Sequence, residues 1–209
     1  MQPIVLGPYS PADAEEKAFA DTSWSGAGPF FPETTTTPDG LAHQVTLTVA
    51  TDDYSGIDFT LVGIDADGNL ISEVLSGPND DTVTSTLFYS QLTEVLVSAS
   101  LDMNAISAGI ANASLLKTIP LDARSVAPAL ITATTGGTIS YQVSQTADDV
   151  FNAPAALECN WFGLKNTASN DSQLFTSTVG ARGIQVSILS STSPATIVIS
   201  LSQASSALG

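Results

Sequence analysis

Apolar and polar residues alternate with a period of two along most of the chain from residue 41 onward. Val45, Leu47 and Val49 alternate with polar side chains, which is typical of a strand with one buried face. Four more runs, rich in threonine and β-branched residues, follow at 57–64, 70–75, 82–88 and 93–99. The pattern therefore predicts a five-strand meander in this part of the chain.

Turn-forming residues separate these runs where a hairpin requires them. Asp65–Asn69 reads DADGN, and Gly68 accepts a positive φ at little cost. We therefore expect a tight hairpin between the runs at 57–64 and 70–75. The next turn is expected at 76–81, which reads SGPNDD.

The second half of the chain shows the same period with more irregular connections. Alternation predicts strands at 139–143, 160–164, 184–189 and 196–202, and the last two read as a terminal hairpin across residues 190–192. Many short strands without a convincing long helix predict an all-β protein. We expect two small β-sandwich domains, Ig-like or jelly-roll-like.

Composition differs before residue 41. Six prolines lie between residues 1 and 40, so this segment is expected to be an extended N-terminal arm. Within it, Ser10 as a cap, Pro11 at the first helical position and the acidic residues that follow predict a short helix at 10–20.

Two domains are expected after the arm. The first covers 41–116 and the second covers 117–209. The stretch KTIPLDARSVAP at 117–128 reads as an extended link with turns at its prolines, so the boundary is placed there.

Three aromatic residues of the arm are candidates for intermolecular contact. Trp24, Phe30 and Phe31 lie among glycines and prolines, and exposed aromatics on such a segment are costly unless they pack on something. Two alternatives are open: they pack on the chain's own domain, or they anchor the arm on a neighbouring subunit.

Charge excludes several classes of partner. The chain has five Lys and Arg against 21 Asp and Glu, a formal net charge of −16, and no basic residue lies between Lys17 and Lys117. Such a surface repels phosphates, so neither nucleic acid nor an anionic membrane is expected as a partner. The negative charge keeps the protein soluble, or it is complementary to a basic partner surface. No run reaches membrane-spanning length, and the first residues do not read as a secretory signal.

Candidate chemistry is sparse. His43 is the only histidine, so no multi-histidine metal site is possible, and we expect it to have no function at its strand end. Cys159 is the only cysteine, which rules out an intrachain disulfide. No hydrolase, metalloprotease, phosphate-binding-loop or dinucleotide motif is present. We therefore expect no enzymatic activity, no catalytic residue and no cofactor.

One motif invites a calcium hypothesis. Asp65, Asp67 and Asn69 follow the opening pattern of a calcium loop. The twelfth position, which needs a bidentate acid, is Ser76, and Glu73 comes three residues too early. A turn is therefore favoured and adventitious Ca²⁺ is the alternative.

The turns and core positions together resemble a family. The first β-unit is similar to a β-domain common in structural proteins of tailed bacteriophages, and the second is similar to a module that often follows it. In the first unit the resemblance rests on Gly56–Gly63, Asp65–Asn69, Glu73, Gly77–Asn79 and Val83–Phe88. In the second it rests on Ile119–Asp122, Pro128, Gly137, Tyr141–Val143, Thr146, Asp148–Phe151 and Trp161.

This resemblance covers roughly residues 40 to 203 and implies a virion component assembled in the host cytoplasm. Its expected partners are copies of itself and the major capsid protein or other virion proteins. An acidic protein that avoids DNA fits a capsid-decorating or cement role on the particle exterior. The alternative is a neck, tail or fibre component, either an adaptor or a receptor- or sugar-binding module.

Overall fold

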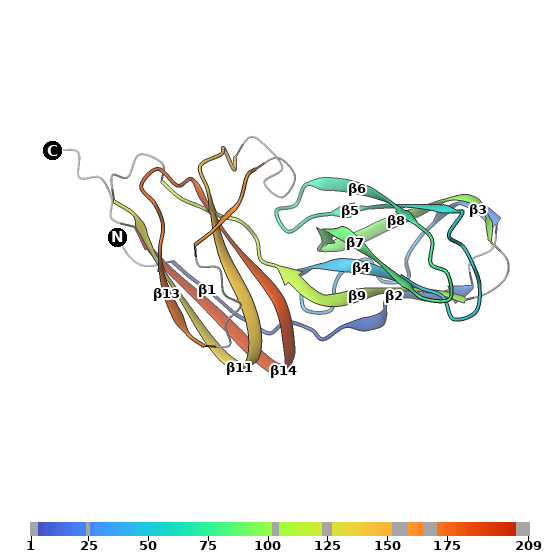
Figure 1. The fold of residues 1–209 in the computed structure, drawn as a ribbon, viewed down its shortest axis with the longest axis horizontal. Helices are drawn as coiled ribbons and strands as arrows, with labels where there is room; N and C mark the ends of the chain where they lie inside the picture. The colour runs from blue at the N-terminus through green and yellow to red at the C-terminus, as the bar shows by residue number, and fades with distance from the viewer. Residues whose placement is uncertain are drawn as a thin grey trace. The chain divides into compact units, whose positions relative to one another are not determined.

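The computed structural model describes residues 4–23, 26–101, 105–122, 127–151, 159–164 and 171–203, and these residues form an all-β protein (Figure 1). The chain divides into two compact units. We call Ala12–Ser114 the meander unit. We call Met1–Pro11 together with Leu115–Gly209 the ribbon unit.

The meander unit is a sandwich of two sheets. One sheet has the order β2-β9-β4-β7, and the other has the order β3-β8-β5-β6. Buried apolar side chains from both sheets, including Val45, Leu47, Phe59 and Leu61, form one core. The strands are β2 (Glu15–Ser23), β3 (Gly26–Phe30), β4 (Ala42–Thr48), β5 (Asp58–Ile64), β6 (Leu70–Ser76), β7 (Thr82–Tyr89), β8 (Gln91–Leu101) and β9 (Ala105–Leu115).

The five strands predicted from alternation are confirmed, but the predicted meander is wrong: β4 pairs with β7 in one sheet, while β5 pairs with β6 and β8 in the other. Each of the five expected runs from residue 45 to residue 99 forms a strand, β4 to β8. The expected hairpin joins β5 to β6 in continuous antiparallel register from Asp58↔Ser76 to Ile64↔Leu70. Gly68 has a φ of 93°, so the turn needs a residue that tolerates the left-handed region.

The short helix predicted at 10–20 is wrong. Residues 15–23 form β2, which pairs antiparallel with β9. Phe19 is buried in the core of the sandwich, and its carbonyl oxygen accepts the backbone N–H groups of Glu33 at 3.1 Å and Thr34 at 3.2 Å. The capping residues at Ser10 and Pro11 favour a helix locally, but the pairing of β2 with β9 outweighs this preference.

The ribbon unit is built on two long strands. β11 (Ala129–Thr146) and β14 (Gly183–Gln203) pair antiparallel along nearly their whole length. Four short strands flank this ribbon: β1 (Ile4–Tyr9) and β10 (Ile119–Pro120) pair with β14, while β12 (Phe162–Gly163) and β13 (Gln173–Thr176) pair with β11.

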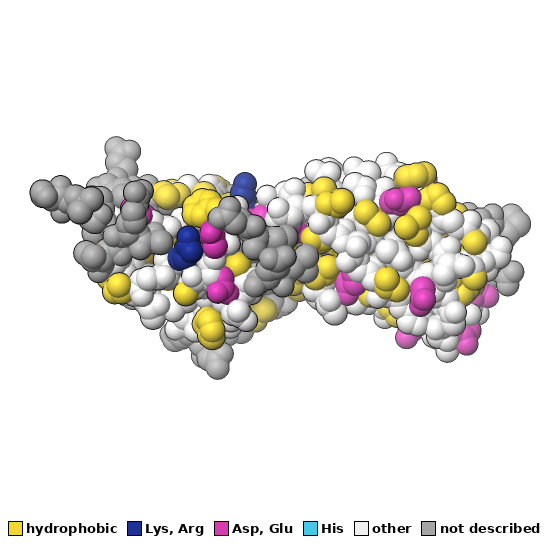
Figure 2. Space-filling view, turned by 90° about the horizontal axis from the view of Figure 1, so that it is seen from above, with side chains coloured by type: hydrophobic (Ala, Val, Ile, Leu, Met, Phe, Trp, Pro, Cys, Tyr) yellow, Lys and Arg dark blue, Asp and Glu magenta, His cyan; other side chains and the backbone are white. Residues whose placement is uncertain are grey.

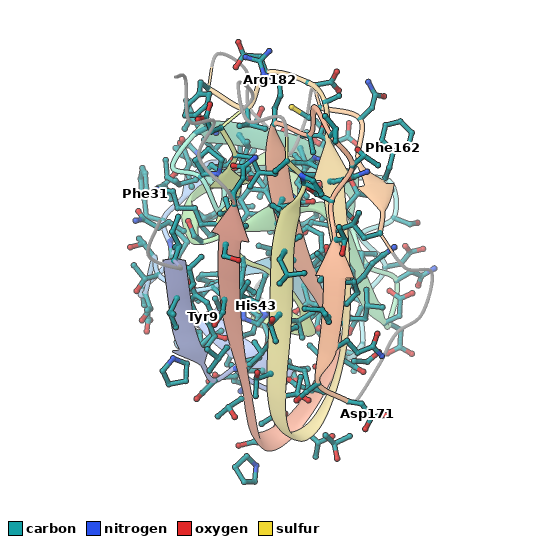
Figure 3. The ribbon with its side chains drawn as sticks, turned by 90° about the vertical axis from the view of Figure 1, so that its left-hand side faces the viewer. Tyr9, Phe31, His43, Phe162, Asp171 and Arg182 are labelled. Carbon is teal, nitrogen blue, oxygen red and sulfur yellow. The ribbon has the colours of Figure 1, made fainter. Side chains whose placement is uncertain are left out.

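The ribbon bends near its middle. The register shifts between Gly136 and Thr138, and Gly137 has a φ of 75°. A Cβ at Gly137 would lie 2.3 Å from the Pro194 carbonyl oxygen, so only glycine fits this close approach. Figure 3 shows both long strands turning back at the bend, which gives the ribbon two layers. Apolar side chains such as Ile139, Tyr141 and Ile197 are buried.

The predicted terminal hairpin is also wrong. Residues 184–189 and 196–202 belong to one strand, β14, and not to two strands joined by a turn. Ser190, Ser191 and Thr192 read as turn residues, but each pairs with a residue of β11. The long partner strand satisfies their backbone groups, and both halves of β14 pair with β11 instead of with each other.

The N-terminal segment takes part in both units. The arm expected at 1–40 contains three strands, β1 to β3. Residues up to Pro11 group with the ribbon unit and the rest with the meander unit. The units divide between Ser114 and Leu115, whereas the sequence placed the boundary after residue 116.

Candidate functional site

The three aromatic candidates have different surroundings. Trp24 lies outside the described residues. Phe30 is half-buried and packs against the core of the meander unit. Phe31 is 69% exposed and is labelled at the margin of the molecule in Figure 3. Of the two aromatics that the structure describes, only Phe31 has most of its surface free for another molecule.

His43 is part of a buried hydrogen-bond network. Its ring is fully buried, with Nδ1 2.9 Å from the carbonyl oxygen of Ala111 and Nε2 2.9 Å from Oδ2 of Asp39. Asp39 also accepts hydrogen bonds from the backbone N–H groups of Ala12 at 2.8 Å and Leu41 at 3.0 Å. These contacts join β4, β9 and the segments that precede β2 and β4.

The charges of this network follow from its geometry. A carbonyl oxygen can only accept, so Nδ1 of His43 carries a proton. Burial raises the pKa of Asp39, but the hydrogen bond from His43 and those from Ala12 and Leu41, together with the charge of His43, hold that pKa below its ordinary value. Asp39 is therefore a carboxylate in contact with the His43 ring and with the backbone N–H groups of Ala12 and Leu41. All its partners lie within the protein, so the network braces the fold.

Asp65 organises a turn. Its side chain is buried, and Oδ1 accepts the backbone N–H groups of Asp67 and Asn69, both at 2.8 Å. Oδ2 accepts the amide of Asn69 at 3.0 Å. Both carboxylate oxygens are thus engaged by the turn itself, which is the Asx-turn geometry expected from DADGN. Across the described residues, no group of three or more His, Cys, Asp and Glu side chains is arranged to hold a metal ion.

Glu73 joins the two sheets of the meander unit at one edge. Its carboxylate accepts the backbone N–H groups of Thr86 and Leu87 at 2.9–3.1 Å and the Thr86 hydroxyl at 2.7 Å. β7 is the last strand of its sheet, so these donors would otherwise be unpaired. Glu73 therefore blocks the edge of β7 from pairing with another chain.

An open groove of about 410 Å³ lies along β2, β4, β7 and β9. Its lining is mostly small and hydroxylated, and two of its threonines, Thr48 and Thr82, bond to each other at 2.7 Å. No aromatic residue lines it, so it lacks the platform on which a sugar ring would stack. It is lined by Ala14, Glu16, Thr46, Thr48, Thr82, Ile110, Ala111 and Asn112.

A more unusual surface lies on the outside of the sheet β3-β8-β5-β6. Leu70 and Val74 of β6 are 71% and 61% exposed, and Leu96 of β8 is 38% exposed. The sequence analysis missed this surface. The signal was present, because the run at 70–75 is apolar on both faces: Ile71 and Leu75 alternate with Leu70 and Val74.

No protein-family model, curated protein or solved structure matches this chain. Within the described ranges, no helix has the length and apolarity that a membrane crossing requires.

Charge is divided unequally between the two units. Sixteen of the 21 acidic residues of the sequence lie in the meander unit, with one of the five basic residues, Lys17. The ribbon unit has the remaining five acids and four bases and is close to neutral. Nearly all of the net charge of −16 is therefore concentrated in one β-sandwich.

Proposed function

We propose that this chain is a non-enzymatic structural protein of a tailed-bacteriophage particle, decorating or cementing the capsid exterior as a symmetric multimer. The observation that carries the proposal is the unequal charge of the two units: the meander unit is strongly acidic and the ribbon unit is nearly neutral. An acidic sandwich repels packaged DNA and attracts basic protein surfaces. The phage-like turn motifs of this unit, at Asp65–Asn69 and Gly77–Asn79, support the same assignment.

The architecture suits repeated assembly. Small β-units give rigid blocks, and in a symmetric shell a modest contact is multiplied by the number of copies. The main polar features of the meander unit are engaged within the fold: the Asp39–His43 network braces it, and Glu73 covers a strand edge. These features stabilise a block that other proteins can contact.

The location on the particle is tested by immunogold labelling of intact purified phage with antibodies against the chain. A decorating protein should give label spread evenly over the head. Label confined to the neck, tail or fibres would show that the protein belongs to those structures and not to the head. Particles without any label, from a preparation in which the chain is detected in the infected cell, would contradict the virion role.

A further inference from the structure

We propose that the outer face of the sheet β3-β8-β5-β6 docks a protein partner whose contact surface has an apolar centre and a rim of lysine and arginine. We call this surface the outer apolar face and define it by Phe31, Leu70, Val74 and Leu96, with the residues between them on the same side of the sheet. Figure 2, which views the molecule from the side of β5 and β6, shows hydrophobic side chains gathered over the meander unit.

The strand register makes this face continuous. Pro29 of β3 pairs with Leu96 of β8, Leu96 pairs with Thr60 of β5, and Thr60 pairs with Val74 of β6. These residues therefore form one row across all four strands. At one end of the face, Ile64 pairs with Leu70. Phe31 directly follows the last residue of β3 and is 69% exposed.

The core of the meander unit does not need these side chains. The opposite face of the same strands supplies Phe59, Leu61, Ile71 and Leu75, which are buried between the two sheets. A sheet with one solvated face normally carries polar residues there. An apolar cluster on the solvated side, in a chain with this many carboxylates, indicates a surface that is covered in the working assembly.

The charged residues around the outer apolar face indicate which kind of partner binds there. Two carboxylates lie on the outer apolar face: Glu94, which pairs with Val62, and Asp58 of β5. Two more, Asp67 and Glu33, lie at its margins. Lys17 is the only lysine or arginine in the sequence of the meander unit. A second copy of this face would bring carboxylates against carboxylates, whereas a basic rim would pair with them.

This inference rests on the surface of the meander unit and goes beyond the location of the protein on a particle. It can hold if the virion role fails, and it can fail if the virion role holds, because its test uses the purified chain alone.

The test is an NMR titration of the isotope-labelled full chain with three short synthetic peptides. Lysine alternates with valine in the first, lysine with serine in the second, and glutamate with valine in the third. The lysine–valine peptide should shift amide resonances of β5, β6 and β8 and bind more tightly than the other two. Replacing Val74→Ser and Leu96→Ser together should weaken its binding by about tenfold or more.

The matched control is the double variant Leu130→Ser and Leu174→Ser in the ribbon unit. These leucines are 43% and 62% exposed, close to the values for Leu96 and Val74, so the same apolar surface is removed elsewhere. The control should bind the lysine–valine peptide like the unmodified chain. Both double variants change exposed side chains, and a dispersed amide spectrum confirms that each is folded.

Four results would overturn the proposal. Equal affinity for the lysine–serine peptide would show that charge alone acts. Resonance shifts outside β5, β6 and β8, or unchanged affinity in the Val74 and Leu96 variant, would place the contact elsewhere. Sedimentation equilibrium that shows self-association of the chain, abolished in that variant, would make a second copy the occupant.

Discussion

Replacing Asp39→Asn removes the negative charge from the most buried ionic network of the meander unit while keeping the shape of the side chain. The Asp39 and His43 side chains are 8% and 0% exposed, so water cannot compensate for the change. The substitution therefore tests whether the network braces β4, β9 and the segment before β2.

The magnitude follows from the hydrogen bonds that Asp39 accepts. Ala12 and Leu41 donate backbone N–H groups to different carboxylate oxygens, and His43 donates to one of them. An asparagine side chain has only one acceptor oxygen, so at least one backbone donor loses its partner, at a cost of about 1–3 kcal/mol. Weakening of the contact with His43 adds to this, so we expect a total loss of about 2–4 kcal/mol.

The assay is urea unfolding followed through resolved amide peaks of each unit. Peaks of Val45 and Leu47 report on the meander unit, and their midpoint should fall by about 2 M urea in the variant. Peaks of Ile131 in the ribbon unit serve as the internal control and should not move. Asp53→Asn is the matched variant, because Asp53 accepts only bonds from Ser55 at an exposed turn, and it should change little.

Acidification gives a second readout. The pKa of Asp39 is lower in the folded protein than in the unfolded chain, where it is about 3.9. Its stabilising contribution is therefore present above that value and is lost as the pH falls through the folded pKa. The difference between the unmodified chain and Asp39→Asn should shrink accordingly. A variant of unchanged stability at neutral pH would refute the bracing role.

Four further predictions concern the same unit, each measured by urea unfolding. Gly77→Ala should destabilise the protein by about 2 kcal/mol, because the added Cβ would lie 2.4 Å from the Tyr54 carbonyl oxygen. Gly56→Ala is the control and should be neutral, because the space around Gly56 is open; equal effects of the two substitutions would contradict the packing. Leu61→Ala should cost about 2–5 kcal/mol and Leu70→Ala almost nothing, since Leu61 is fully buried and Leu70 is exposed; similar losses would refute the assigned faces. Tyr89→Phe should not destabilise, because the buried hydroxyl has no hydrogen-bond partner among the described residues; a clear loss would reveal one. Glu73→Gln should cost about 1–2 kcal/mol of stability, because the backbone N–H groups of Thr86 and Leu87 lose an acceptor. The exposed edge of β7 should also promote aggregation, measured by light scattering; unchanged scattering would show that the edge is protected in another way.

The sequence predicted the strands β4 to β8 well because their signals are local. Alternation from Val45 onward assigned the strands β4 to β8, and the residues DADGN fixed the hairpin between β5 and β6. Both signals depend on a few neighbouring residues, so no knowledge of the partner strand was required.

Predictions failed where distant pairing decides the structure. Residues 10–20 have a helical capping signal, but β9 accepts part of this segment as the strand β2. Ser190–Thr192 resemble a turn, but the long strand β11 pairs with them. The sequence also showed His43 without its partners, because Ala111 is 68 residues away and the role of Asp39 depends on Ala12. The run at 70–75 showed that β6 is apolar on both faces, but the register was needed to place Leu96 and Val74 in one row, on either side of Thr60.

The most direct test of the proposed role is the copy number of this chain per purified particle, measured by quantitative mass spectrometry against the major capsid protein. A capsid-decorating protein predicts about one copy for each capsid subunit, or about one for every three, as closed symmetry requires. A few copies per particle would contradict decoration and place the chain in the neck, tail or fibres. Its absence from the particles would contradict the virion assignment as a whole.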